Sequence, residues 1–259
     1  MLNLVEILQG FNPINLEEMD SVSLMNRVDC KFVMSTNQLP RILESLQSTY
    51  RILEIDNGRS FSYHTTYLDT YDFLFFYQHV TGKLERNKIR YRRYEATGNT
   101  FLEIKKRTNK NRTIKWRVEN SLATNLTCDE KANQFIKEYI PNISLTLKPF
   151  LINQFRRITL VGTEIRERLT IDFDLAFSDT SGNQIKLPYL SIVELKKEGF
   201  SHRSPVIEIL KKNSIHPNGF SKYCIGMALL YDPPRKNILK SKLLLLNKIE
   251  NEFNRCLTA

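Results

Sequence analysis

Apolar and polar residues alternate with a period of two through much of the segment from residue 51 to 119. The runs are RILEI (51–55), FSYHTTYLD (61–69), KIRYRRYE (88–95), NTFLEIKKR (99–107) and RTIKWRVE (112–119), with the turn-forming stretches NGR, ATGN and TNKN between them. Such alternation places successive side chains on opposite faces of a strand. The segment therefore predicts an antiparallel meander.

Helical spacing flanks this meander on both sides. It indicates helices at 14–26, 37–49, 128–140, 204–213, 220–231 and 238–257, and further strand-like runs at 27–34, 150–160, 164–177 and 188–197. The pattern predicts an α+β fold, a single-domain antiparallel β-barrel of about eight strands with helices packed outside it. No repeat or Gly/Ser linker divides the chain, so we expect one domain over residues 1–259, with a core from about 20 to 232 and a C-terminal helix from about 237 to 259.

On strand after strand, one face is apolar and the other is ionic. The ionic faces carry Arg27, Asp29 and Lys31; Arg90 and Arg92; Glu103, Lys105 and Arg107; Lys115, Arg117 and Glu119; Arg168, Thr170, Asp172 and Asp174; and Glu194 with Lys196. Two interpretations are open. The sheet could have one ordinary solvated face, or it could form a closed barrel whose charged faces point inward, with a polyanion, a metal or water offsetting the repulsion between them.

The charge of the chain favours an anionic partner. Its 259 residues include 38 basic and 28 acidic side chains, a formal net charge of +10, which suits nucleic acid, phosphorylated metabolites or a lipid surface. The four cysteines have neither zinc-site nor disulfide spacing. The first residues do not resemble a signal peptide, and no apolar run approaches the ~18 residues of a spanning helix. These features predict a cytoplasmic protein without a membrane segment.

The strand motifs, taken in order, resemble a known family. They are RVDCKFV (27–33), YLD (67–69), IRYRRYE (89–95), FLEIKKR (101–107), FRR (155–157), RLTIDFDLAF (168–177), VELK (193–196) and FSKYCIG (220–226). This order is similar to that of the VTC domain, the polyphosphate-polymerase branch of the triphosphate tunnel metalloenzymes, which are also grouped as CYTH-like proteins. The resemblance implies that the barrel is a triphosphate tunnel.

The resemblance also implies roles for individual residues. Transferred position by position, the catalytic residues are Lys31, Arg90, Arg92 and Arg168, the phosphate-binding residues are Lys105, Lys115, Arg157, Lys196 and Lys222, and the metal ligand for Mn²⁺ or Mg²⁺ is Glu194. The choice between Arg156 and Arg157 stays open, because a shift of one residue in register exchanges their faces.

The implied function is metal-dependent phosphoryl transfer from a nucleoside triphosphate to a growing inorganic polyphosphate chain. The wider superfamily opens with a Glu-x-Glu-x-Lys strand, whereas this chain has Arg27-x-Asp29-x-Lys31, which argues against a simple triphosphatase. Two alternatives remain: a triphosphatase acting on inorganic or organic triphosphates, and a non-catalytic module that binds polyphosphate or RNA. Nucleic acid is the less favoured ligand, because Tyr91 and Tyr94 fall on opposite faces and form no continuous stacking platform.

Overall fold

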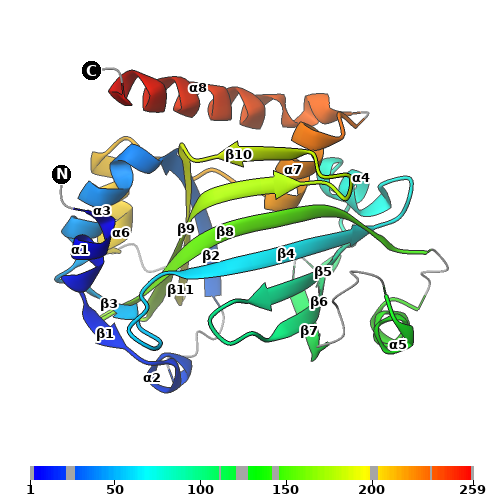
Figure 1. Ribbon diagram of the computed structural model, residues 1–259, viewed down its shortest axis with the longest axis horizontal. Coiled ribbons are helices and arrows are strands. Elements are labelled where there is room, and N and C mark those ends of the chain that lie inside the picture. Colours follow the sequence, from blue (N-terminus) through cyan, green and yellow to red (C-terminus); the bar gives the residue numbers. More distant parts are fainter. Residues whose placement is uncertain are drawn as a thin grey trace.

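A large curved sheet forms the centre of the protein (Figure 1). The computed structural model describes residues 3–21, 27–110, 112–120, 128–141, 146–198, 204–233 and 235–257. Its strands are β1 (Asn12–Ile14), β2 (Arg27–Ser35), β3 (Tyr50–Leu53), β4 (Phe61–Asp69), β5 (Arg86–Tyr94), β6 (Thr100–Arg107), β7 (Thr113–Glu119), β8 (Lys148–Gly162), β9 (Glu167–Ser178), β10 (Gln184–Leu187) and β11 (Leu190–Glu198).

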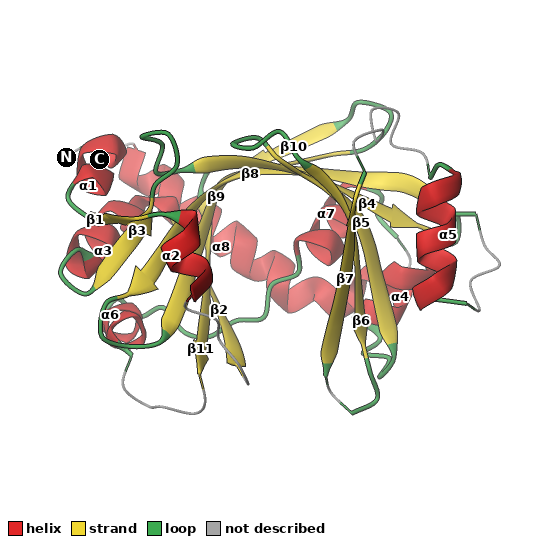
Figure 2. Ribbon diagram, turned by 90° about the horizontal axis from the view of Figure 1, so that it is seen from below, coloured by secondary structure: helices red, strands yellow, loops and turns green. Residues whose placement is uncertain are grey.

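Eight of these strands follow one antiparallel path in the order β2-β11-β9-β8-β4-β5-β6-β7. Off this path, β10 pairs with β9, and β3 pairs with β8 and, in parallel, with β1. Figure 2 shows that the path bends into an arch, so that β2 and β11 stand opposite β6 and β7. The predicted mixed fold, with a large antiparallel sheet and helices outside it, is confirmed.

The sheet curls but does not close by strand pairing. Strands β2 and β7 are its two edges, and no hydrogen-bonded ladder joins them within the described residues. A loop instead contacts the edge of β2 that no strand pairs with. There Phe32 forms an isolated bridge with Pro217, and the Asn218 amide donates to the Lys31 carbonyl. The expectation of a closed barrel is therefore corrected to an arch.

The helices pack against the apolar parts of the sheet. They are α1 (Leu4–Gln9), α2 (Leu16–Ser21), α3 (Leu39–Leu46), α4 (Leu74–Val80), α5 (Glu130–Tyr139), α6 (Pro205–Lys212), α7 (Lys222–Leu230) and α8 (Lys240–Leu257). Helices α1, α3 and α6 share one buried apolar cluster with β2, β8, β9 and β11, and α4, α5, α7 and α8 share another with β4, β5 and β6. None of the described helices is both long enough and apolar enough to cross a bilayer.

Two helical segments differ from the sequence prediction. Helix α4 interrupts the expected meander of residues 51–119, and its first turn is capped by the buried Asp69 carboxylate, which accepts the amides of Phe75 and Phe76. The helix expected at 14–26 is shorter, because β1 extends to Ile14 and α2 spans Leu16–Ser21; residues 22–26 lie outside the described part.

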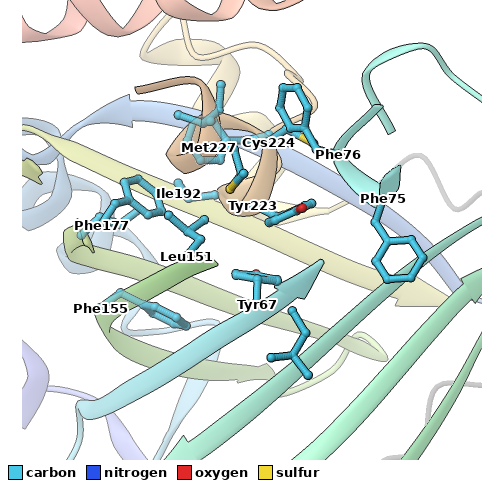
Figure 3. Close-up of a cluster of buried hydrophobic side chains, with 14 of the residues drawn as sticks. Tyr67, Phe75, Phe76, Leu151, Phe155, Phe177, Ile192, Tyr223, Cys224 and Met227 are labelled. Atoms are coloured by element: carbon cyan, nitrogen blue, oxygen red, sulfur yellow. The ribbon is translucent and has the colours of Figure 1, made fainter. Parts of the chain in front are cut away.

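Helix α7 is buried on nearly all sides and fixes the start of the FSKY segment. Figure 3 shows its side chains Tyr223 and Met227 near Leu151 of β8 and Phe177 of β9, whereas Cys224 lies beside Phe76 of α4. A Cβ atom added at Gly226 would lie 2.7 Å from Leu151 Cδ2 and 2.8 Å from Phe177 Cδ1, so a glycine is needed for this close approach. The helix therefore holds Lys222, its first residue, against the inner face of the sheet.

Candidate functional site

Charged side chains from opposite walls of the arch meet at the segment Phe220–Lys222. Lys31 Nζ, on edge strand β2, donates to the Phe220 carbonyl at 3.2 Å, and Lys88 Nζ, on β5, donates to Ser221 Oγ at 3.0 Å. Four strands separate β2 from β5 along the sheet. The ionic faces can approach the same short segment only because the sheet curves around it.

The most tightly paired group joins β8, β9 and α7. The Arg157 guanidinium donates from Nε and Nη2 to the two Asp172 oxygens at 2.5 and 2.8 Å, and Lys222 Nζ also binds Asp172. Burial opposes ionisation of Asp172, but the two cations outweigh it and lower the pKa of this carboxyl. The result is a buried carboxylate held charged between two cations.

A second carboxylate, Glu194 on β11, lies beside this group. Its side chain is 21% exposed and pairs with Lys196 Nζ at 3.4 Å, and its direct neighbours across the sheet are Lys31 and Thr170. Burial opposes its ionisation, but Lys196 and Lys31, with Arg157 and Lys222, lower the pKa of Glu194 below its ordinary value. Glu194 is thus an ionised carboxylate that remains in contact with solvent.

The other wall of the arch carries Arg90 and Arg92. Arg90 donates to Glu103 from Nε at 2.7 Å and forms a 2.6 Å ion pair with it through Nη2, while Arg92 Nε donates to Thr65 Oγ1 at 3.3 Å. Burial opposes ionisation of Glu103, yet Arg90 and Arg92 lower its pKa to about 2. The two arginines are only 7% and 9% exposed. An ordinary solvated face is therefore the wrong interpretation of the ionic pattern here.

Two more of the expected phosphate-binding residues follow Arg90 along this wall. Lys105 on β6 lies directly across from Lys115 on β7. Arg90, burial and Lys115 together depress the pKa of Lys105 well below its ordinary value. Lys115 is exposed at the edge of the sheet. Like charges placed opposite one another destabilise a sheet, so this row is costly without an anion.

Arg168 lies at the end of the site that is next to α2. Its Nη2 donates to the carbonyl of Met19 in α2 at 3.1 Å, and its direct neighbour across the sheet is Lys196 of β11. The open choice between Arg156 and Arg157 is resolved, because Arg157 reaches the buried Asp172 whereas Arg156 is exposed and donates to Ser60 Oγ at 2.6 Å.

One expected position on the ionic face is wrong. Asp174 does not follow Asp172 inward: it has a left-handed backbone (φ 52°), its side chain is 52% exposed, and it pairs with Arg156 at 3.8 Å. The β8–β9 register shifts between Gln154 and Arg156, which reverses the alternation from this point.

The site contains residues that the sequence did not single out. Asp172, Glu103, Lys88 and Tyr67 all lie within it. The Tyr67 hydroxyl accepts a hydrogen bond from Arg90 Nη1 at 3.5 Å, the Arg90 guanidinium lies over the Tyr67 ring, and the Tyr223 ring packs against the same ring. Alternation placed Asp172 and Glu103 on the ionic faces, but it could not show which cations they pair with. The side chain of Arg27 lies outside the described part, and Asp29 is exposed.

Glu194 fits a divalent cation only if the substrate supplies most of the ligands. Among the described residues, no three His, Cys, Asp or Glu side chains gather into a metal-binding group. Asp172 is already bound by Arg157 and Lys222, whereas Glu194 is ionised and partly exposed. Magnesium is typically held by one or two carboxylates together with substrate phosphates. A single carboxylate beside a group of cations that suits phosphate meets that description.

The fold and site together define an arched sheet whose inner face gathers cations that suit a compact, highly charged anion. Residues 26–231 match the VTC domain family, so this chain belongs to that family. The resemblance noted in the sequence is confirmed over almost the same range. Family membership supports phosphoryl chemistry on polyphosphate or triphosphate.

Solved structures with a similar arrangement share little sequence with this chain. One is a protein from Bacillus halodurans, provisionally assigned as an adenylate cyclase, at 17% identity over 76% of this chain and 96% of that one, with a TM-score of 0.49. Another, from Hippeastrum, carries the same provisional assignment and has a dominant triphosphatase activity, at 12% identity over 80% and 97% of the two chains, with a TM-score of 0.48. A third, from Vibrio parahaemolyticus and also provisionally assigned as an adenylate cyclase, has 11% identity over 78% and 97%, with a TM-score of 0.45. No curated protein matches the sequence.

Proposed function

We propose that this protein transfers the terminal phosphoryl group of a nucleoside triphosphate to an inorganic polyphosphate chain, in a reaction that needs Mn²⁺ or Mg²⁺. The observation that carries the proposal is the convergence of part-buried cations from both walls of the arch on one segment, Phe220–Lys222. Cations outnumber carboxylates there, so the site is incomplete without an anion. Membership of the VTC domain family directs the proposal toward triphosphate and polyphosphate.

Phosphoryl transfer asks a protein mainly for positioning and for stabilisation of charge on the transferring group. Arg157, Arg90 and Arg92 suit both tasks, because a guanidinium can bond two phosphate oxygens at once. In this proposal Lys31, Arg90, Arg92 and Arg168 contact the reacting phosphates, and Lys105, Lys115, Arg157, Lys196 and Lys222 bind the remainder of the anion. The low exposure of Arg90 and Arg92 strengthens each contact, because little water competes for it.

Glu194 would hold the metal, which would draw charge from the phosphate oxygens and reduce repulsion between donor and acceptor. Lys196 and Lys31 keep this carboxylate ionised, and therefore able to bind a cation, throughout the neutral pH range. Asp172 has a different task in the proposal. It holds Arg157 and Lys222 in place until phosphate oxygens reach them.

Transfer to a phosphate acceptor and transfer to water would use the same donor site, so the product distinguishes them. The test is to incubate purified protein with ATP and Mn²⁺ and to separate long-chain polyphosphate from orthophosphate on a gel. We expect polyphosphate that lengthens with time, and we expect none to form when the metal is chelated from the start. Orthophosphate alone would show a triphosphatase, and no turnover with any nucleotide, despite tight tripolyphosphate binding, would show a binding module.

A further inference from the structure

The hairpin of β6 and β7 carries a long series of cations with no carboxylate among them. The basic residues between Ile104 and Val118 are Lys105, Lys106, Arg107, Lys110, Arg112, Lys115 and Arg117. Lys105 and Lys115 belong to the site described above. Lys106 lies on the opposite face of β6, and Lys110 and Arg112 lie in the turn, so the proposed reaction leaves their charge unexplained.

The turn of this hairpin is short and projects from the sheet. The Thr108 amide donates to the Arg112 carbonyl at 2.8 Å, which closes the turn, and Lys106 and Ile114 are direct partners across the hairpin. Figure 2 shows the turn at the lower tip of its wall of the arch. Lys110 and Arg112 are exposed there, and Ile114 is 42% exposed.

A second exposed segment, residues 81–85, lies beside this turn. Arg86 at the start of β5 is the partner of Arg107 at the end of β6, so the residues before Arg86 and those after Arg107 leave the sheet at the same end. Leu84 is 65% exposed, Lys83 is exposed next to it, and Glu85 is the one carboxylate of this segment.

Together the two segments form one surface, which we call the basic tip. The basic tip consists of Lys83, Leu84, Lys106, Lys110, Arg112 and Ile114. None of its four cations forms an ion pair with another residue in the part of the chain that the structure describes. Grouped cations of this kind attract an anionic surface, and two large aliphatic side chains stand exposed among them.

We infer that the basic tip docks on a membrane surface that contains anionic lipids, with Leu84 and Ile114 entering the boundary between headgroups and acyl chains. Cations next to an anionic bilayer strengthen binding, and aliphatic side chains add to it by leaving water. The tip is a projecting turn without an aromatic side chain, so it suits a flat bilayer better than a nucleic acid, whose bases need a stacking platform. This inference does not depend on the proposed reaction.

The test is sedimentation of the purified full chain with vesicles of phosphatidylcholine alone and of equal parts phosphatidylcholine and phosphatidylglycerol. We expect binding to the anionic vesicles only, and weaker binding as the salt concentration rises. Each cation near an anionic surface contributes about fivefold to affinity, so Lys106→Gln combined with Lys110→Gln should weaken binding about 25-fold. Leu84→Ser should weaken it about tenfold without changing its salt dependence.

Two matched controls separate docking at the tip from a general effect of charge or exposed apolar surface. Lys211→Gln combined with Lys212→Gln removes two exposed cations from the end of α6, and Leu244→Ser removes a similarly exposed leucine from α8. Vesicle binding should be nearly unchanged in both, and the melting temperature should be unchanged in all four variants. Equal losses in the tip and control variants, or no binding of the unaltered protein to anionic vesicles, would overturn the inference.

A second probe distinguishes a bilayer from an acidic protein. If the tip variants lose binding to poly-L-glutamate and keep their binding to anionic vesicles, the tip docks on an acidic protein and the inference is wrong. It is also wrong if Leu84→Ser binds the vesicles as tightly as the unaltered protein, because the aliphatic side chains would then not enter the bilayer.

These measurements are independent of the proposed function. Polymer synthesis in solution should be unchanged in the tip variants, because Leu84, Lys106 and Lys110 lie outside the proposed site. A protein that makes no polymer from ATP but docks through the basic tip would refute the proposed reaction alone. A protein that makes polymer but does not bind anionic vesicles would refute the docking surface alone.

Discussion

Replacing Asp172 by Asn tests whether this carboxylate is the counter-ion of the site. The substitution keeps the size of the side chain and removes its charge, so Arg157 and Lys222 are left as neighbouring buried cations. Their side chains are 14% and 13% exposed, and that of Asp172 is 3% exposed, so water can replace little of the lost interaction. Removing one partner of a buried ion pair typically costs about 3–5 kcal/mol.

For a protein of this size, a change of 1 kcal/mol shifts the melting temperature by about 2 °C, so we expect the Asp172→Asn variant to melt roughly 6–10 °C lower. Tripolyphosphate should reverse much of this loss, because its oxygens supply the negative charge that the variant lacks. It should also bind about tenfold more tightly to the variant than to the unaltered protein, since it no longer competes with Asp172 for the two cations. Differential scanning calorimetry and isothermal titration calorimetry measure the two effects.

The matched control is Asp174→Asn, two residues along the same strand. Its carboxylate is 52% exposed and 3.8 Å from Arg156, and a surface pair of this kind contributes at most about 1 kcal/mol. Asparagine also tolerates the left-handed backbone at this position. The counter-ion role of Asp172 is refuted if both variants melt within about 2 °C of each other and tripolyphosphate stabilises them equally.

Three further predictions concern the metal, the packing of α7 and the protonation of the site. Glu194→Gln should retain the fold and metal-free tripolyphosphate affinity but lose Mn²⁺-dependent turnover by orders of magnitude; retained turnover would show that Glu194 is a counter-ion only. Gly226→Ala should lower stability by about 1–3 kcal/mol in calorimetry, because the added Cβ meets Leu151 and Phe177. Gly219→Ala should change it little, because the added Cβ would make only an ordinary contact, with Lys242 Nζ at 3.9 Å. Tripolyphosphate binding should take up protons in the pH range between the depressed pKa of Lys105 and the ordinary pKa of a lysine, because the anion favours the charged amine. Calorimetry in buffers of different ionisation enthalpy should show this proton uptake, and Lys105→Met should reduce it.

The sequence predicted the strands and their faces because a period of two is a local property. Arg90, Glu103 and Glu194 lie on the inner face where alternation placed them. Alternation fails at Asp174, where a single left-handed residue reverses the faces of the strand. Aspartate tolerates that conformation, but its presence alone does not predict a bulge.

Features that depend on distant contacts were not predictable in the same way. Helix α4 begins where the Asp69 carboxylate, from the preceding strand, accepts its first amides and binds Tyr223 of α7. The periodicity of residues 74–80 contains no sign of that cap. Closure of the sheet likewise depends on whether two edge strands far apart in sequence can pair, and here the loop at Pro217 and Asn218 meets β2 instead.

The arrangement of charge explains why the stability of this protein should depend on its ligand. The apolar faces of the strands are covered by helices and supply the stabilising burial, whereas the inner face gathers cations that repel one another. Anything that binds the folded state alone stabilises it by mass action, and a polyanion here also removes the repulsion. Substitutions that neutralise inner cations, such as Lys88→Met, should therefore raise the stability of the free protein while reducing the stabilisation that the anion provides. Substitutions that remove a carboxylate, such as Asp172→Asn, should do the opposite, so the two kinds of variant together show whether this face is organised around an anion.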